Sequence, residues 1–480
     1  MEDSTATYES LMKLKDLESR SASEALDHVG LLIELSSDLR KIEGLRQAMK
    51  LAEELYKRKL GNEQLATLHY FVANAWSHLR QLSRVTEEQV WAWEQPEFEK
   101  EIIYLRRASQ GNGFRGLPAE YQCRILTNLG NALDHIGRFV EAIEFWDKAL
   151  EVESGFSMAL GNKGEGLTHY ARALYDKGHK GLILKCALTD LRAALSSEDL
   201  HEGARKSFDA YRLRIESALS PEFLTQEFDV NSFSLGASRQ EIEYRRWCLK
   251  NRLFLNPLND LGPYTIGGRD ILTTPDIVDS IDAGPRYPGF FNQMKQEFAS
   301  ARYLCYEGIN ERQPHFSDRE VLLYNTLDYP SYSVATERIK SAFRICYSIF
   351  DKAAFFLNHY LDLAIPEKSV KFRTFWYIEQ SRKKGLRADF ENRQNWPLRG
   401  LFWLSKDLYE EEVGFKEAIE PDARELSEIR NHLEHKYLKL HGDDWSGPPP
   451  ANDELSRSLS DTLAFSMYRR DFERKTLKLL

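Results

Sequence analysis

The sequence predicts an all-α protein in which an array of helical repeats is followed by a helical bundle. Apolar residues recur at spacings of three and four along much of the chain, which places them on one face of a helix. No segment alternates between apolar and polar residues strongly enough to predict a sheet. A pattern of small and large residues also repeats along the first half of the chain, which is typical of stacked helix pairs.

The repeat is clearest in residues 126–154, LTNLGNALDHIGRFVEAIEFWDKALEVES. The segment GNKGEGL (161–167) repeats TNLGNAL (127–133) after 34 residues. Positions at spacings of four and three recur as Glu101, Leu105 and Ala108; Ala142, Trp146 and Ala149; and Ala187, Leu191 and Ala194. This pattern resembles the tetratricopeptide repeat (TPR), whose helix pairs leave a concave surface that binds another protein. The other intervals are longer and indicate an irregular array, and an ordinary helical bundle is the alternative.

The helical pattern of the first half continues to about Leu219, so we expect a TPR-like repeat domain at residues 1–222 and a linker at 223–238. Residues 239–480 form the second predicted domain. Its expected helices cover 290–308, 336–364, 396–411 and 421–442. The last of them starts with a proline at its first turn and stops at a glycine, which are ordinary helix boundaries.

Composition limits the classes of function. The net charge of −9 excludes nucleic-acid binding through bulk charge, so an RNA site has to be a local basic patch. The five cysteines are scattered and form no CxxC pair, which argues against disulfides and a zinc site and favours the reducing cytosol. No apolar run is long enough to cross a bilayer, and the N-terminus has no signal-peptide pattern. We expect a cytoplasmic protein without a cofactor, a metal or a membrane partner.

The segment RNHLEHKY (430–437) lies near the end of the predicted helix 421–442. At about 100° per residue, one apolar stripe of this helix contains Leu426, Ile429, Leu433, Tyr437 and Leu440. His435 lies opposite the stripe, one turn after Asn431 on the same face. Arg430 lies at the edge of the stripe, and its long side chain can reach the polar face. Leu438 falls on the face of His435, which indicates that something, such as a second subunit, covers this face.

The order Arg-Asn-x-x-x-His resembles the motif of the HEPN superfamily, small all-α domains found in many prokaryotic ribonuclease toxins and defence proteins. The segments 239–262 and 336–364 also resemble a bacterial HEPN subfamily that follows TPR repeats. The resemblance implies that His435 is the general acid or base, that Arg430 contacts the scissile phosphate, and that Asn431 orients His435 or the phosphate. It also implies a homodimer in which two motifs meet across the interface.

Such a site cleaves RNA without a metal ion, because the 2′-OH of RNA is the nucleophile and a cation stabilises the charge that develops on the phosphorus centre. The expected function is therefore a metal-independent endoribonuclease that acts in a toxin–antitoxin system or in anti-phage defence. The alternative is a non-catalytic module, in which TPR repeats bind a protein partner and the HEPN fold binds nucleotide or RNA. A pure scaffold is a third hypothesis.

Four residues are candidate accessories to the motif. Tyr437 extends it to Arg-x4-His-x-Tyr, and in some HEPN toxins a tyrosine so placed is nucleotidylated, but its position on the apolar stripe favours packing. His432 lies one turn from His435, and a solvated side chain is the favoured interpretation. Asp351 and Lys352 interrupt an apolar helix, so they either reach the motif or form a structural ion pair.

A basic segment follows the long apolar helix. Residues 371–406 contain nine Lys or Arg and three Asp or Glu, with the aromatic run FRTFWY (372–377) among them. Basic residues that alternate with aromatics can bind phosphates and stack on bases. The candidate RNA-binding residues are Arg373, Arg382, Lys383, Lys384 and Arg387. A solvated loop beside core aromatics is an equally supported interpretation.

Overall fold

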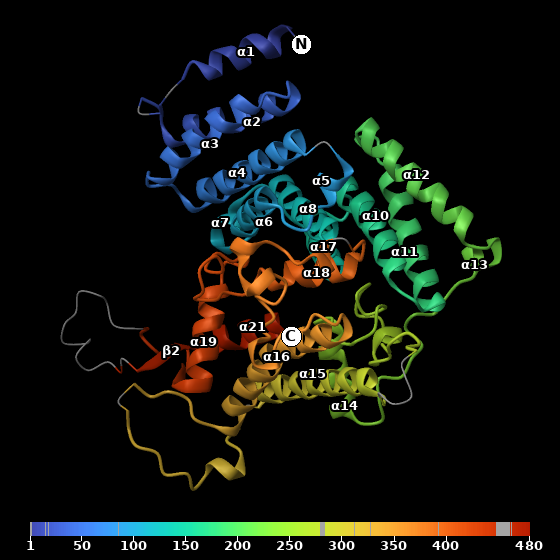
Figure 1. The fold of residues 1–480 in the computed structure, drawn as a ribbon, viewed down its shortest axis with the longest axis vertical. Coiled ribbons are helices and arrows are strands. Elements are labelled where there is room, and N and C mark those ends of the chain that lie inside the picture. Colours follow the sequence, from blue (N-terminus) through green and yellow to red (C-terminus); the bar gives the residue numbers. More distant parts are fainter. Residues whose placement is uncertain are drawn as a thin grey trace. The chain divides into compact units, whose positions relative to one another are not determined.

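The computed structural model describes residues 2–480 except residues 15, 18, 85, 279–283, 312, 327, 392, 448–460 and 462. The chain is mostly helical (Figure 1), which confirms the predicted all-α class. In the described part, the strands form one small sheet in which β1 (Tyr437–His441) pairs in parallel with β2 (Ala464–Tyr468). No described helix has both the length and the apolar character that a membrane crossing requires.

The chain divides into two compact units. Unit 1 contains residues 1–228, 391–407 and 419–421, and unit 2 contains the rest. The first boundary therefore falls inside the predicted linker 223–238. The sequence assigns residues 391–407 to the second domain, whereas the structure places them in unit 1.

The helices of unit 1 are α1 (Glu2–Met12), α2 (Ala22–Asp38), α3 (Ile42–Tyr56), α4 (Asn62–Ser83), α5 (Glu87–Trp91), α6 (Pro96–Ala108), α7 (Gly111–Gly116), α8 (Ala119–His135), α9 (Phe139–Val152), α10 (Ser157–Ala173), α11 (Lys177–Leu195), α12 (Glu202–Ala218), α13 (Pro221–Thr225) and α18 (Trp396–Ser405). Those of unit 2 are α14 (Arg239–Lys250), α15 (Arg286–Asn310), α16 (Val334–Tyr360), α19 (Ala423–His435) and α21 (Arg469–Leu479), and α17 (Ala388–Glu391) leads from unit 2 into unit 1. Short 3-10 helices cover Thr265–Gly267 (η1), Phe316–Asp318 (η3), Glu367–Ser369 (η4), Ile378–Gln380 (η5) and Arg382–Lys384 (η6). The helices expected at 290–308, 336–364 and 396–411 correspond to α15, α16 and α18.

The packing of Trp146 explains part of the repeat pattern in unit 1. This side chain is 1% exposed and lies between α8 and α10. A Cβ atom on Gly130 of α8 would lie 2.6 Å from Trp146 Nε1, and one on Gly166 of α10 would lie 2.2 Å from Trp146 Cη2. Both contacts are too short for any side chain, so the large indole requires a glycine on each neighbouring helix.

Residues 391–407 belong to unit 1 because their side chains bind the end of α8. Trp396 Nε1 and Arg399 Nη1 donate hydrogen bonds to the carbonyl of His135, at 3.1 and 2.8 Å. Gly137, in the turn that follows, has a φ of +90°, and a Cβ atom there would lie 2.3 Å from the carbonyl oxygen of Trp396. These donors satisfy a carbonyl that the helix end leaves without an intrahelical partner.

A buried ionic cluster also joins residues 391–407 to the other helices of unit 1. The guanidinium of Arg106 lies 2.9 Å from Glu141 and 3.3 Å from Glu420, and it also pairs with Asp407. Arg138 pairs with the same Asp407 at 2.6 Å. Since a charge buried in a protein interior has to be paired, these contacts act together, and removing one partner leaves the others uncompensated.

Replacing Arg106 by alanine is therefore expected to lower the free energy of unfolding by about 3–5 kcal/mol. Arg124→Ala is the matched control, because Arg124 pairs with Glu120 on an exposed surface, and such a pair contributes at most about 1 kcal/mol. Urea denaturation followed by circular dichroism measures both. Equal stability losses in the two variants would contradict a structural role for the buried cluster.

Unit 2 is built on the long antiparallel pair α15 and α16. A Cβ atom on Gly308 of α15 would lie 2.7 Å from the carbonyl oxygen of Ala335 on α16, so the two backbones approach closely. The helix α21 packs on this pair, with the rings of Phe472 and Phe343 centred 5.5 Å apart. Small buried side chains line the contact between α15 and α16: Ala301, Cys305, Ala342 and Cys346.

The prediction of one helix over residues 421–442 is wrong after His435. The helix α19 ends at His435, Lys436 leaves helical geometry with φ −137° and ψ −135°, and β1 follows. The strand pairs with β2, which lies more than twenty residues later and leaves no local signal in the sequence. Polar residues of β1 are buried together with apolar ones, so the alternation expected of a strand is absent.

Candidate functional site

The Arg-Asn-x-x-x-His motif occupies the last two turns of α19. The apolar residues Ala423, Leu426, Ile429 and Leu433 bury one face of this helix, as the spacing predicts. At the other end of α19, the ammonium of Lys475 from α21 lies 3.1 Å from Asp422 and 2.8 Å from Glu425. The first turn of α19 is thus fixed by an ion pair, and its last turns carry the motif.

Asn431 and His435 are exposed, one turn apart. Among the described residues, neither side chain has a hydrogen-bond or ionic partner within the chain. Both are therefore available to a ligand or to another protein chain.

Arg430 is half-buried, and its guanidinium lies over the ring of Tyr347 on α16, 5.2 Å from the ring centre. In the described part of the chain, no carboxylate forms an ion pair with Arg430. Burial raises the pKa of the Tyr347 hydroxyl, so this ring is neutral at ordinary pH. A neutral aromatic face holds the guanidinium by cation–π attraction and does not cancel its charge.

Two carboxylates complete the surroundings of Tyr347. Asp351, one turn further along α16, accepts a hydrogen bond from the backbone N–H of Phe372 at 3.0 Å. Burial raises the pKa of Glu410, and the cations Lys371 and Arg430 oppose this shift. Asp351 thus lies beside the residue that holds Arg430, whereas Lys352 forms an ion pair with Glu297 of α15. Lys352 therefore forms an ion pair of the structural kind, and the hydrogen bond of Asp351 goes to the backbone of Phe372 and not to a residue of the motif.

Arg344 is a further basic residue at the site that the sequence analysis missed. It lies on α16, and its Nη2 donates a hydrogen bond to the carbonyl of Leu433 at 2.7 Å. Its Nε lies 3.9 Å from Glu434, the neighbour of His435. A cation at the C-terminus of a helix is favourable, and this one contacts the two residues that precede His435. Its only sequence signal is a basic residue within a mostly apolar helix.

Structure changes the interpretation of two other motif residues. His432 is half-buried, so the favoured hypothesis of a solvated side chain is wrong. Its Nδ1 donates to the carbonyl of Glu428 at 2.8 Å, and its ring faces Phe465 of β2. Tyr437 does not pack on an apolar stripe, because the helix ends before it. It is 42% exposed, and its hydroxyl donates to Asp461, which raises the pKa of Tyr437.

The dimer interface predicted at Leu438 is also wrong. Leu438 lies in β1 opposite Phe465 and is 3% exposed, so it does not share a helix face with His435. The cause of the error is the end of α19 at His435. Leu438 therefore takes no part in a contact between two copies, whereas the exposed Asn431 and His435 stay accessible to one.

The basic segment divides into core and surface residues. Arg373 is 1% exposed and stacks on Phe415, with 5.1 Å between the guanidinium and the ring centre, so it is withdrawn as an RNA-binding residue. The aromatic side chains of 372–377 are buried and cannot stack on bases, which supports the interpretation of core aromatics. Lys383 and Lys384 are exposed, and Arg382 and Arg387 are half-buried.

These surface residues differ in their partners. Lys384 lies 3.6 Å from Glu379 at the surface, a weak pair that leaves its charge accessible. Arg387 Nη1 donates a long hydrogen bond of 3.5 Å to the carbonyl of Leu363. Among the described residues, no group of three or more His, Cys, Asp and Glu side chains is arranged to hold a metal ion.

Comparison with known proteins concerns the second half of the chain. Residues 278–480 match the family model of LA2681-like HEPN domains. The match covers less than half of the chain and includes α15, α16, α19 and the sheet, and it supports the HEPN resemblance of this part. No family match confirms the TPR resemblance of residues 1–222, which stays a prediction. The searches of curated proteins and of solved structures found no match.

Burial of Leu438 leads to a stability prediction. Leu438→Ala is expected to lower the free energy of unfolding by about 2–5 kcal/mol, the usual cost of truncating a buried leucine. Tyr437→Phe, the control at the neighbouring exposed position, is expected to change it by less than about 1 kcal/mol. Chemical denaturation measures both values. A Leu438→Ala variant as stable as the parent would place this side chain at the surface after all.

Proposed function

We propose that the protein is a metal-independent endoribonuclease of HEPN type. One observation carries the proposal: the Arg-Asn-x-x-x-His motif lies at the end of α19, inside the segment that matches the HEPN family, with Asn431 and His435 exposed and unpaired within the described chain. HEPN domains are generally ribonucleases, and the residues here suit that chemistry. A role in a toxin–antitoxin system or in anti-phage defence, in the cytoplasm, is part of the proposal.

The proposed roles follow from side-chain chemistry. An imidazole is suited to proton transfer near neutral pH, so His435 removes the proton of the 2′-OH or protonates the leaving 5′-oxygen. Arg430 binds the scissile phosphate, because a guanidinium can contact two phosphate oxygens and stays charged. Its support by the neutral ring of Tyr347 favours this role, since among the described residues no carboxylate forms an ion pair with it. Asn431 orients the phosphate or His435.

One copy of the chain supplies an incomplete site. Arg430 and His435 are five residues apart on a helix that turns by about 100° per residue, so their Cβ atoms point about 140° apart. Cleavage by the 2′-OH also needs both a base and an acid, and one motif has a single exposed histidine in catalytic position. We therefore propose a homodimer in which two motifs combine, and RNA contacts from Arg344, Arg382, Lys383, Lys384 and Arg387.

A second candidate function concerns unit 1. This unit contains a cavity of about 350 Å³ whose lining includes Asn74, Asn128, Asn131 and Arg80. Side-chain amides each offer a donor and an acceptor, so such a cavity suits a segment of a protein partner. In this alternative the chain is a non-catalytic module that binds a protein through unit 1 and nucleotide or RNA through unit 2.

Single substitutions distinguish the two functions. His435→Ala and Arg430→Ala are each expected to lower the RNA cleavage rate by at least about 100-fold, as loss of an acid–base group or a phosphate contact does. Neither side chain fills the core, so the melting temperature should stay close to that of the parent. His359→Ala is the matched control, because His359 is a partly exposed histidine of α16 outside the motif. Cleavage of a labelled RNA by the purified variants is the measurement, and full activity in His435→Ala would refute the assignment.

The proposed mechanism also determines which products form and whether cleavage requires a metal ion. Cleavage should persist in excess EDTA and leave a 2′,3′-cyclic phosphate, because the 2′-OH is the nucleophile and His435 and Arg430 supply the acid–base and charge-stabilising groups. A single 2′-deoxy nucleotide at the cut site should block the reaction. Mass spectrometry of the products tests both points. Loss of cleavage in EDTA that added magnesium restores would indicate a different class of nuclease.

A further inference from the structure

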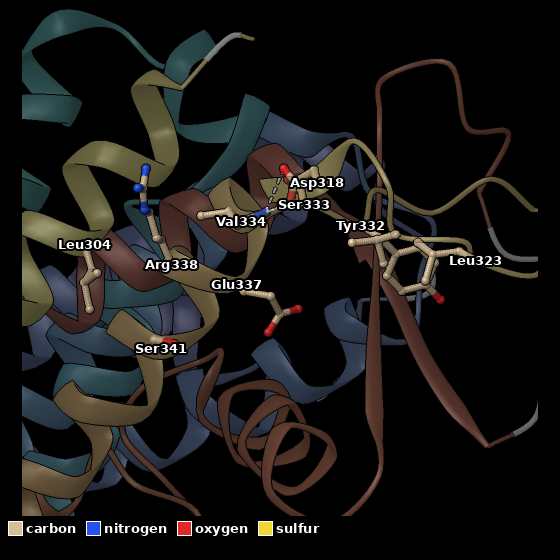
Figure 2. Close-up of a pocket in the computed structure, with 10 residues that line it drawn as sticks. Leu304, Asp318, Leu323, Tyr332, Ser333, Val334, Glu337, Arg338 and Ser341 are labelled. Atoms are coloured by element: carbon tan, nitrogen blue, oxygen red, sulfur yellow. Dashed lines mark hydrogen bonds between the residues drawn. The ribbon is translucent and has the colours of Figure 1, made fainter. Parts of the chain in front are cut away.

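A cavity lies at the start of α16 in unit 2. Its volume is about 380 Å³, and its lining comes from α15, from the first turns of α16 and from the segment between η3 and α16. Figure 2 shows Leu323 and Tyr332 on one side of it and Leu304 and Ser341 on the other. Ligand pockets in proteins measure about 300–1,000 Å³, so this cavity is near the lower end of the range and suits a single ring system.

The lining combines apolar side chains with an aromatic ring and a carboxylate. Leu304, Leu323 and Val334 supply apolar surface, Tyr332 supplies the ring, and Glu337 supplies the carboxylate. Tyr332 is 43% exposed and the side chain of Glu337 is 55% exposed, so a ligand can reach both from solvent. A flat aromatic ligand that stacks on the ring can therefore present hydrogen-bond donors on its edge to the carboxylate.

A phosphate is a poor occupant of this cavity. The carboxylate of Asp318 accepts the backbone N–H of Val334 at 3.1 Å, so a donor at the start of α16 already has an acidic partner. Arg338, a cation in the lining, lies 3.0 Å from Glu311. The carboxylates of Asp318 and Glu337 would repel a phosphate. The cavity thus favours an uncharged ring that carries N–H groups.

Two contacts place the cavity beside α19 and β1. Ser341 precedes Arg344 by one turn of α16, and Arg344 Nη2 donates a hydrogen bond to the carbonyl of Leu433 at 2.7 Å. The backbone N–H of Ser331, next to Tyr332, donates to the carbonyl of Leu440 at 2.6 Å. A helix rises by about 1.5 Å per residue and a stacked nucleic-acid strand by about 3.4 Å per nucleotide. A strand bound at the motif therefore reaches the cavity within a few nucleotides.

We propose that the cavity binds one nucleobase of a single-stranded RNA substrate, and that guanine is the base it prefers. The ring of Tyr332 stacks on the base, and the carboxylate of Glu337 accepts hydrogen bonds from the Watson–Crick edge of the base. The inference rests on the proposed nuclease function for the identity of the ligand, and it adds a base preference to that function.

The preference for guanine follows from the acceptors of Glu337. Lys340 is 7% exposed and donates to Glu337 at 2.8 Å, which holds this side chain and uses one of the about four acceptor positions of a carboxylate. Guanine has two adjacent donor groups on its Watson–Crick edge, N1–H and the N2 amino group, and the two oxygens of a carboxylate can accept from both. Adenine, cytosine and uracil have no adjacent pair of donor groups on this edge. Guanine therefore gains one hydrogen bond over each of them.

Binding of single-stranded oligonucleotides to the full chain tests the preference. The probes are fluorescent 2′-O-methyl oligouridylates that differ in one central residue, which is guanosine, inosine, adenosine or uridine. By fluorescence anisotropy, guanosine is expected to bind about tenfold more tightly than adenosine, and inosine, which lacks the N2 amino group, in between. The comparison uses the unaltered protein, so it does not depend on the folding of a variant. Equal affinities for guanosine and adenosine would overturn the inference.

Glu337→Gln tests the carboxylate. The substitution replaces one acceptor oxygen by a donor amide, so it should weaken binding of the guanosine probe by about tenfold and leave the uridine probe nearly unchanged. Glu243→Gln is the matched control, because Glu243 is a half-exposed, ion-paired glutamate of α14, also in unit 2. Circular dichroism checks that both variants fold. A Glu337→Gln variant that still prefers guanosine would show that another group reads the base.

Tyr332→Ala tests the stacking. Loss of the ring should weaken all four probes by about tenfold, the usual contribution of one stacked base, whereas Tyr332→Phe keeps the ring and should bind like the parent. Equal affinities in the parent and the alanine variant would remove Tyr332 from the site.

Ser341→Trp distinguishes a base from a protein side chain as the occupant. The indole fills the cavity, so the guanosine probe should bind no better than the uridine probe. If this variant keeps the affinity of the parent for RNA but sediments differently, the cavity binds a protein chain and the inference is wrong. Methylated probes cannot be cleaved, so the two proposals fail separately. Guanosine-specific binding without cleavage of ordinary RNA refutes only the nuclease, and cleavage by a protein without guanosine preference refutes only the base site.

Discussion

The ammonium of Lys439 is the contact on which the geometry of the motif region depends. Lys439 is 3% exposed, at the centre of β1, and its Nζ lies 2.8 Å from Asp328 and 3.2 Å from Asp461. Burial by itself would lower the pKa of Lys439, but the two carboxylates outweigh it and raise the pKa, so the side chain stays charged. One cation therefore joins Asp328 in the segment before α16, β1, and Asp461 in the segment before β2.

This contact explains where α19 ends. A helix continued beyond His435 would direct Lys439 away from these carboxylates, whereas an extended strand places it between them. The same strand binds Ser331 through the carbonyl of Leu440, so the segment just before α16 is fixed to the chain that follows the motif. His435 consequently lies at the last position of the helix, next to a turn, where its imidazole is exposed.

The sequence predicts what depends on local periodicity and misses what depends on distant partners. The spacing of Leu426, Ile429 and Leu433 predicts the buried face of α19, as the structure confirms. The strand that follows has no such signal, because the buried Lys439 is paired with carboxylates that lie far from it in the sequence. The prediction for Arg373 is wrong for the same reason. A basic residue next to aromatic ones in the sequence suggests a surface patch, but the sequence does not show that this side chain is buried. The Arg430–Tyr347 contact joins two helices that no spacing relates.

The different partners of the arginines show how an acidic chain can present positive charge. Arg106 and Arg302 are buried against carboxylates, with Arg302 held 2.7 Å from Asp270, so their charges stabilise the fold and are neutralised there. Arg430 is instead held by the ring of Tyr347, and in the described chain no carboxylate pairs with it. A net charge of −9 repels RNA at long range, so a phosphate can be bound only where a local cation is not held in an ion pair. Because α16 supports Arg430 with the ring of Tyr347 and not with a carboxylate in an ion pair, a phosphate site at Arg430 is physically reasonable.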